Sequence, residues 1–133
     1  MKRLIFVLLA FTTLYLSSCQ KDDKTTPNAD IYGTWTCSET CVTFGTQNYH
    51  VDISADNTSS NVVVIDNFFN LGLGKSIKVN ISGQTLTINN ANLDGNTFNG
   101  SGTISSNNNT ITWHYTFDDG NGPENVTATY TRL

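Results

Sequence analysis

Residues 111–117 read Ile111-Thr112-Trp113-His114-Tyr115-Thr116-Phe117, with a large apolar side chain at every second position. Successive side chains of a β-strand point to opposite faces, so this alternation predicts a strand with one buried and one exposed face. Trp113, Tyr115 and Phe117 are expected in the core. His114 is expected in solvent, because it alternates with these apolar residues.

The same period of two recurs along the chain, and no stretch after residue 30 shows helical spacing. The other predicted strands cover residues 31–37, 49–55, 61–66, 77–81, 86–88, 98–104 and 126–130. Short turn signals such as Ser82-Gly83 and Asp94-Gly95 join several of them, which favours antiparallel hairpins in sequence order. The sequence therefore predicts an all-β fold of eight antiparallel strands, which can either close as an up-and-down barrel or pack as a β-sandwich.

A short motif adds a family resemblance. Gly33-Thr34-Trp35 near the start of the domain, together with Arg132 near its end, resembles the Gly-x-Trp and C-terminal arginine pair of lipocalin-like, or calycin, barrels. The resemblance implies an eight-stranded antiparallel up-and-down barrel, with a β-sandwich left as the alternative. It also implies that Arg132 lies across the Trp35 ring and closes one end of the barrel. Cation–π stacking of this kind contributes about 0.5–2 kcal/mol.

The domain as a whole, residues 31–133, also resembles the small uncharacterised lipocalin-like lipoproteins of Gram-negative bacteria. Those proteins likewise carry Gly-Thr-Trp soon after a short tether and end in a strand with an aromatic residue, a threonine and a basic residue. The chain departs from lipocalins in length, since the predicted domain is short for that family.

The N-terminus is typical of an export signal. Lys2 and Arg3 precede an apolar run over residues 4–16, and small residues follow. A membrane-spanning helix needs about 20 apolar residues, so this run is too short to be a stable span. Residues 16–19, Leu-Ser-Ser-Cys, resemble the lipobox of bacterial lipoproteins. The resemblance predicts a signal peptide over residues 1–18 and a Cys19 that carries lipid acyl chains such as palmitate, which anchor the protein to a membrane.

Residues 19–30 are polar, contain Pro27 and lack periodicity, which predicts a flexible tether. The Lys-Asp-Asp run at 21–23 resembles the tract that sends lipoproteins to the outer face of the outer membrane in some Gram-negative bacteria, although a merely solvated linker gives the same pattern. We therefore expect outer-membrane attachment with exposure on the cell surface. The periplasmic face is the alternative.

Cys37 and Cys41 are the two cysteines left for the domain. An oxidising compartment favours a disulfide between them. Four extended residues separate two Cα atoms by about 13 Å, and a disulfide tolerates about 7 Å, so a bond requires the chain to turn at residues 38–40. A zinc site and free thiols are the alternatives.

The composition argues against several classes of function. Downstream of residue 18 only five side chains are basic, against eleven acidic ones in the chain, so no basic stripe is available for nucleic acid. Asp118, Asp119, Asn121 and Glu124 do not follow the EF-hand spacing and are expected in a solvated loop. No phosphate-binding loop, cofactor motif or nucleophile elbow is present. We expect no enzyme, cofactor or metal site.

The apolar connection at residues 67–74 contains Phe68 and Phe69 beside two glycines. Large apolar side chains in a loop must bury against something, so they either plug one barrel end or form a portal or partner-docking loop. The leading hypothesis is noncatalytic binding of a small apolar or glycan-derived ligand. The candidate lining residues are Trp113, Tyr115, Phe117, Phe68 and Phe69. The alternative is a protein-interaction module, either an accessory subunit of a surface complex or a hydrolase inhibitor.

Overall fold

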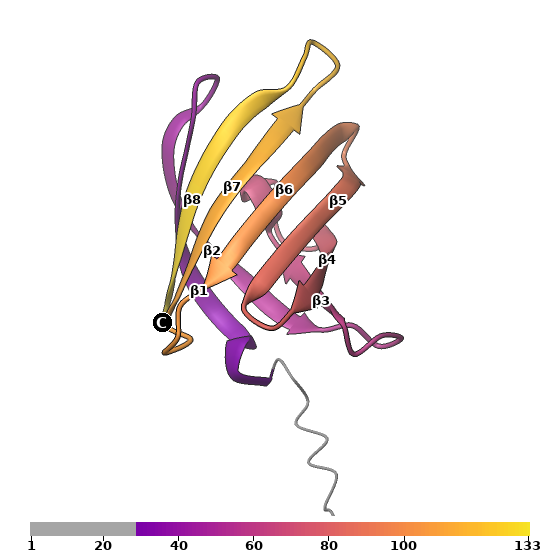
Figure 1. Cartoon of the computed structure of the whole chain (residues 1–133). Coiled ribbons are helices and arrows are strands. Elements are labelled where there is room, and N and C mark those ends of the chain that lie inside the picture. Colours follow the sequence, from indigo (N-terminus) through magenta and orange to yellow (C-terminus); the bar gives the residue numbers. More distant parts are fainter. Residues whose placement is uncertain (1–28) are drawn as a thin grey trace, which may run out of the picture.

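The computed structural model describes residues 29–133, which form a closed barrel of eight antiparallel strands (Figure 1). The strands are β1 Gly33–Cys41, β2 Gly45–Ala55, β3 Val62–Asp66, β4 Ser76–Ser82, β5 Thr85–Leu93, β6 Asn96–Ile104, β7 Thr110–Asp118 and β8 Glu124–Arg132. Each strand pairs with its sequence neighbours, and β1 pairs with β8 to close the barrel. The predicted up-and-down barrel is confirmed, and the sandwich alternative is wrong.

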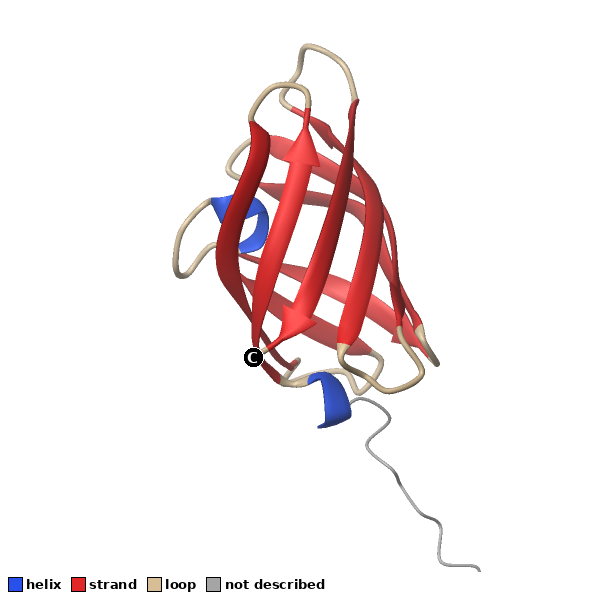
Figure 2. Cartoon of the chain, turned by 90° about the vertical axis from the view of Figure 1, so that its left-hand side faces the viewer, coloured by secondary structure: helices blue, strands red, loops and turns tan. Residues whose placement is uncertain are grey.

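The links between strands alternate between the two ends of the barrel, because consecutive strands run in opposite directions. The 3-10 helix η1 (Ala29–Ile31), the β2–β3, β4–β5 and β6–β7 links and the C-terminus lie at one end, called here the η1 end. The other four links lie at the η2 end, named after the 3-10 helix η2 (Phe68–Asn70) in the β3–β4 link (Figure 2). No helix among residues 29–133 is long and apolar enough to cross a membrane.

Burial follows the alternation of the sequence. In β7 the side chains of Ile111, Trp113, Tyr115 and Phe117 are buried in the barrel, whereas His114 is exposed. Eight strands enclose an interior that side chains can fill or that can hold one small ligand. A single hydrophobic cluster occupies this interior and includes inward-facing residues of every strand.

Two glycines in β6 make room for the aromatic residues of β7. A Cβ on Gly102 would lie 2.7 Å from the Trp113 ring, and a Cβ on Gly100 would collide with the Cα of Tyr115. Gly102 pairs with Trp113 across the ladder, and Gly100 pairs with Tyr115. The glycines of the Gly100-Ser101-Gly102 run therefore allow close packing of large rings inside the barrel.

The predicted disulfide is wrong. Cys37 and Cys41 are both free thiols, and both lie on β1. β1 begins at Gly33, two residues later than predicted, and continues through Cys41, so the required turn at residues 38–40 does not exist. The chain turns instead after Cys41. Two cysteines four residues apart on one extended strand point to the same face, but their Cα atoms are too far apart to be bridged.

Candidate functional site

A cluster of polar side chains lies inside the barrel, among the aromatic core residues. It is formed by Glu39 on β1, Tyr49 on β2, Trp113 and Tyr115 on β7, and Tyr130 on β8. These strands are consecutive around the barrel, because β8 lies between β7 and β1 and β1 pairs with β2. The register brings the side chains together, since Cys37 of β1 is opposite both Tyr49 and Tyr130.

Glu39 is the one buried residue with a charged side chain among residues 29–133, and 1% of its surface is exposed. The Tyr115 hydroxyl donates a hydrogen bond to its Oε2 atom. Burial raises the pKa of the Glu39 carboxyl, and hydrogen bonding from Tyr115 partly opposes this rise. Burial therefore favours the neutral form of this carboxyl, and the Tyr115 hydrogen bond favours the ionised form.

Four buried polar atoms of this cluster have no hydrogen-bond partner within the described chain: Glu39 Oε1, Tyr49 Oη, Trp113 Nε1 and Tyr130 Oη. Buried polar groups in native proteins are nearly always paired, since an unpaired one costs about 1–3 kcal/mol. Trp113 and Tyr130 lie side by side, with ring centroids 5.7 Å apart. The cluster thus presents convergent, unsatisfied hydrogen-bonding atoms on aromatic walls, an arrangement typical of small-molecule sites.

The Cys37 thiol is also part of this interior. It is fully buried, and burial raises its pKa to about 12. The thiol stays protonated near neutral pH and is a poor nucleophile there. Cys37 is therefore a small packing residue of the cluster.

The predicted lining residues are buried, but most of them contact one another. Phe69 stacks on Phe117 with 4.6 Å between ring centroids, and Phe68 lies 5.3 Å from Tyr115. Phe98 of β6 packs against both η2 phenylalanines, at 5.1 and 5.2 Å. Phe68 and Phe69 fill the barrel next to Tyr115, so they act as the plug of the η2 end in this structure.

The backbone of the plug is strained. Phe69 has φ 57° and ψ 27°, and Asn67 and Asn70 are also left-handed. Asparagine tolerates this region, but for a bulky residue such as phenylalanine it is an outlier. Residues held in this way cluster at ligand clamps and switch regions. The surrounding residues therefore hold the plug in its strained backbone conformation.

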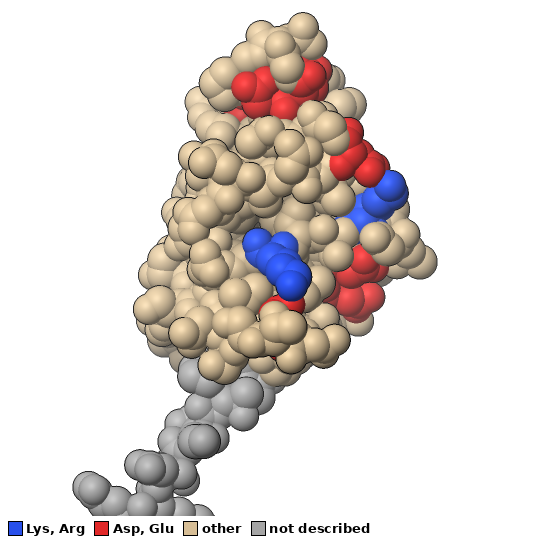
Figure 3. Space-filling model, turned by 90° about the vertical axis from the view of Figure 1, so that its right-hand side faces the viewer, with Lys and Arg blue, Asp and Glu red and all other residues tan. Residues whose placement is uncertain are grey.

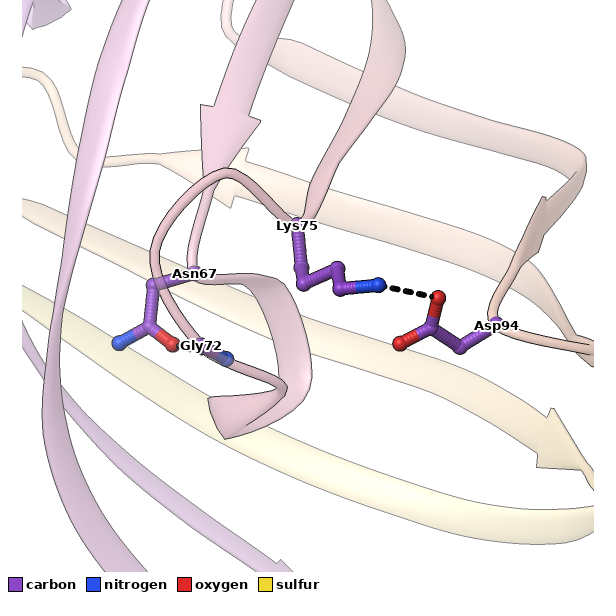
Figure 4. A network of polar contacts seen from close by, with 4 residues as sticks. All are labelled: Asn67, Gly72, Lys75 and Asp94. Carbon is purple, nitrogen blue, oxygen red and sulfur yellow. Dashed lines mark hydrogen bonds and ion pairs between the residues drawn. The ribbon is translucent and has the colours of Figure 1, made fainter.

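Polar contacts hold the plug in place. Asn67 accepts a hydrogen bond from Gly72 N at 2.8 Å and donates one to the His50 carbonyl at 2.7 Å. At the end of the same link, Lys75 pairs with Asp94 of the β5–β6 turn at 2.7 Å; Figure 4 shows this pair beside Asn67 and Gly72. All of these contacts are exposed or partly buried, so water can replace them when the segment moves.

Two hollows lie outside the packed interior. One, of about 130 Å³, is at the η2 end and is lined by Phe44, Gln47, Phe69, Asn70 and Leu71. The other, of about 310 Å³, lies over β6, β7 and β8 around Gly100 and the exposed His114. The hollow at the η2 end touches the plug directly through Phe69, whereas the hollow over β6, β7 and β8 is lined in part by Tyr115.

Trp35 and Arg132 lie together at the η1 end. The Arg132 guanidinium carbon is 4.6 Å from the centre of the Trp35 ring. Trp35 Nε1 donates to the Ile31 carbonyl at 2.9 Å, and Arg132 donates to the carbonyls of Asp30 and Asn108. This end is therefore closed by a cation–π contact and by η1, which begins two residues before the predicted domain start at residue 31.

The carboxylates at the two ends of the β7–β8 link accept hydrogen bonds from backbone N–H groups. Asp118 accepts hydrogen bonds from Gly120 N at 2.8 Å and Gly122 N at 3.2 Å, and Glu124 accepts one from Thr43 N at 2.7 Å. No group of three or more His, Cys, Asp or Glu residues within residues 29–133 is arranged to hold a metal ion. Cys19, the signal peptide and most of the tether lie outside the described residues.

Sequence reasoning missed Glu39, Tyr49 and Tyr130 as site residues. The interpretation of residues 38–40 as a turn hid the fact that Trp35, Cys37, Glu39 and Cys41 share one face of a continuous strand. The signal was present, because Glu39 is in phase with the apolar residues on either side of it. A carboxylate at an inward position of a barrel strand is the mark that could have identified the site.

Sequence comparison assigns no family, since the chain matches no protein-family model and no curated protein. Solved structures do share its fold. A redesigned β-barrel matches with a TM-score of 0.59 and 16% identity, covering 81% of this chain and 96% of that one. A second, the redesigned barrel mFAP1 bound to DFHBI, matches with a TM-score of 0.59 and 18% identity, covering 81% of this chain and 100% of that one. A third, EF1p2_mFAP2b bound to DFHBI, matches with a TM-score of 0.56 and 18% identity, covering 78% of this chain and 94% of that one. These likenesses show the fold.

Proposed function

We propose that this protein is a noncatalytic binding protein of the cell envelope that holds a small ligand inside its barrel. The observation that carries the proposal is the set of four buried, unpartnered polar atoms on Glu39, Tyr49, Trp113 and Tyr130. A ligand that paired with them would recover the free energy that their burial costs. The buried, protonated Cys37 thiol and the exposed His50 and His114 form no catalytic arrangement with the cluster.

The fold is compatible with a ligand of modest size. Two of its structural neighbours, which share 18% identity with this chain, bind the small molecule DFHBI. In this chain Phe68 and Phe69 occupy the interior beside Tyr115, so the ligand must displace them. The strained backbone of Phe69 lowers the cost of that displacement, because the strain is released when the segment moves.

Native mass spectrometry of protein purified from its own host tests the proposal. We expect a small molecule that stays bound under native conditions and is lost on unfolding. Ala128 faces the cluster, opposite both Glu39 and Trp113, so Ala128→Leu should fill the site and abolish the bound mass. Thr129→Leu places the same side chain on the exposed face and is the matched control. Equal occupancy in both variants, or no bound mass in the wild type, would contradict the proposal.

We also propose that Cys19 carries the lipid that anchors the barrel to the outer membrane. The polar tether and the export signal support this anchor. Cys19→Ala, in a form that is still exported and cleaved, should release a folded barrel into the soluble fraction. Retention of this variant on the membrane would contradict the proposal.

A second candidate function is protein interaction at the η2 end. Three large apolar side chains are exposed there: Val42 at 90%, Phe44 at 51% and Leu73 at 83%. Exposed apolar groups on one end of a small domain favour contact with a partner. Crosslinking on intact cells tests this function. A defined partner that is lost in a Val42→Ser, Leu73→Ser double variant supports it, and an unchanged pattern contradicts it.

A further inference from the structure

We propose that the ligand is a small amine, whose ammonium group binds the buried carboxylate of Glu39 and whose oxygen acceptor meets Trp113. This inference rests on the proposed function and names the chemical class of ligand for the same site. It is carried by the missing counter-charge of Glu39 and by the kinds of atoms that surround it.

Glu39 has no basic partner in the described chain. Its Oε2 atom is bonded by Tyr115 and its Oε1 atom by nothing. The basic side chains of residues 29–133 are engaged elsewhere: Lys75 with Asp94 at 2.7 Å, Lys78 with Asp56 at 2.8 Å, and Arg132 with Trp35 and backbone carbonyls at the η1 end. Burial favours the neutral form of this carboxyl in the ligand-free barrel, and a ligand cation would stabilise the ionised form by pairing with it.

The walls of the cluster also suit a cation. Tyr49 and Tyr130 each present a buried, unpartnered hydroxyl, whose lone pairs can accept the remaining N–H groups of an ammonium. The rings of Trp113 and Tyr130 offer negative π faces, to which ammonium groups bind well once water is excluded. An anionic ligand would instead be repelled by ionised Glu39.

Trp113 Nε1 adds a second requirement. This atom is buried without a partner, and an indole N–H can only donate. It cannot pair with an ammonium group, but it can pair with a hydroxyl or carbonyl oxygen. The site therefore calls for an amine that also carries an oxygen acceptor.

The η2 end is negatively charged, which favours the approach of cations. Its links carry Asp94, Asp118 and Asp119, against Lys75, which is already paired with Asp94. Figure 3 shows acidic side chains gathered at the upper end of the molecule, with few basic ones among them. Such a field raises the local concentration and the association rate of a cation. The same end holds the plug that the ligand must displace.

Calorimetric titration with tyramine and with 4-ethylphenol tests the inference. The two probes have the same aromatic ring and hydroxyl, but only tyramine carries an ammonium group. We expect wild-type full-length protein to bind tyramine at least tenfold more tightly than 4-ethylphenol. Glu39→Gln should reduce tyramine affinity by about tenfold or more and leave 4-ethylphenol unchanged, since a hydrogen bond to a charged group contributes about 1.5–3 kcal/mol. Asp119→Asn, which removes an exposed carboxylate, is the matched control and should bind tyramine within about twofold of wild type.

The outcomes separate this inference from the proposed function. If 4-ethylphenol binds as tightly as tyramine, the amine assignment is overturned while the interior site stands. No tyramine binding by the wild type also overturns the amine assignment, and the host ligand found by native mass spectrometry then decides the proposed function independently. Tyr130→Phe keeps the ring and Glu39 but removes one acceptor, so it should weaken tyramine about three- to tenfold with unchanged thermal unfolding.

Discussion

Tyr115 on β7 donates a hydrogen bond to Glu39 on β1, across the intervening strand β8. The two residues are 76 positions apart in the sequence. The Tyr115 hydroxyl bonds one oxygen of the buried carboxylate, and the second oxygen, Glu39 Oε1, has no hydrogen-bond partner among residues 29–133. Because this pairing is incomplete, we expect Glu39 to affect both the stability of the barrel and the proposed ligand binding.

Glu39 should make the ligand-free barrel less stable as pH rises. Burial raises the pKa of its carboxyl in the folded state above the value in the unfolded chain. The folded state therefore binds the Glu39 proton more tightly than the unfolded chain does. The stabilisation that comes from this proton is lost as pH rises from the pKa of the unfolded state through the pKa of the folded state. Over that window the free energy of unfolding of wild type, minus that of Glu39→Gln, should fall by up to about 1.4 kcal/mol per pH unit. Urea unfolding at a series of pH values measures this difference; a constant or rising difference would contradict it.

Gly102→Ala should destabilise the barrel by about 1–3 kcal/mol, because its Cβ would overlap the Trp113 ring. Gly100→Ala should cost more, since its Cβ would meet the Tyr115 backbone, which cannot rotate away as a side chain can. Ser101→Ala, exposed between the two glycines, is the matched control and should change little. Thermal unfolding ranks the three variants, and equal melting temperatures would refute the close packing of β6 on β7.

Phe68→Ala should cost about 3–5 kcal/mol if the plug is part of the core, because the side chain is fully buried against Phe98 and Tyr115. Leu73→Ala, in the same link but 83% exposed, should stay within about 0.5 kcal/mol of wild type. Denaturant unfolding gives both values. A cost for Phe68→Ala as small as that for Leu73→Ala would mean that the plug is dispensable for folding and would favour a portal.

Arg132→Ala should destabilise the barrel by about 1–3 kcal/mol, since it removes the contact with Trp35 and hydrogen bonds to backbone carbonyls. Arg132→Lys should recover part of this loss, because it keeps the charge over the ring but lacks the planar fork of donors. Thermal unfolding followed by circular dichroism distinguishes the two. A lysine variant as unstable as the alanine variant would show that the charge over the ring contributes nothing.

Cys37 and Cys41 should both be free, and Cys37 should be unreactive in the folded protein. Cys37 is fully buried, and its pKa is raised to about 12, so almost no thiolate is present near neutral pH. Alkylation of the denatured chain without reductant should label both cysteines of the tryptic peptide that covers residues 25–75, whereas alkylation of the folded chain should leave Cys37 unlabelled. A peptide that is labelled only after reduction would show that Cys37 and Cys41 are joined by a disulfide.

The sequence determined the strands, whereas their closure into a barrel follows from the pairing of β1 with β8. Alternation around Trp113, Tyr115 and Phe117, repeated along the chain and separated by short turns, was enough to predict eight antiparallel strands, since side-chain period and hairpin geometry are local properties. The direction in which each side chain points follows from the same period. For this reason the exposure of His114 and the burial of the aromatic residues were predicted correctly.

Only the tertiary structure decided which inward residues meet. Whether residues 38–40 turn or continue as a strand depends on pairing with β2 and β8, and that pairing placed Glu39 inside and separated Cys37 from Cys41. The left-handed backbone of the β3–β4 link, which places Phe68 and Phe69 beside Tyr115, is likewise seen only in the folded chain. The site is created by long-range register and packing, which are properties of the closed barrel. Local sequence patterns therefore cannot predict it.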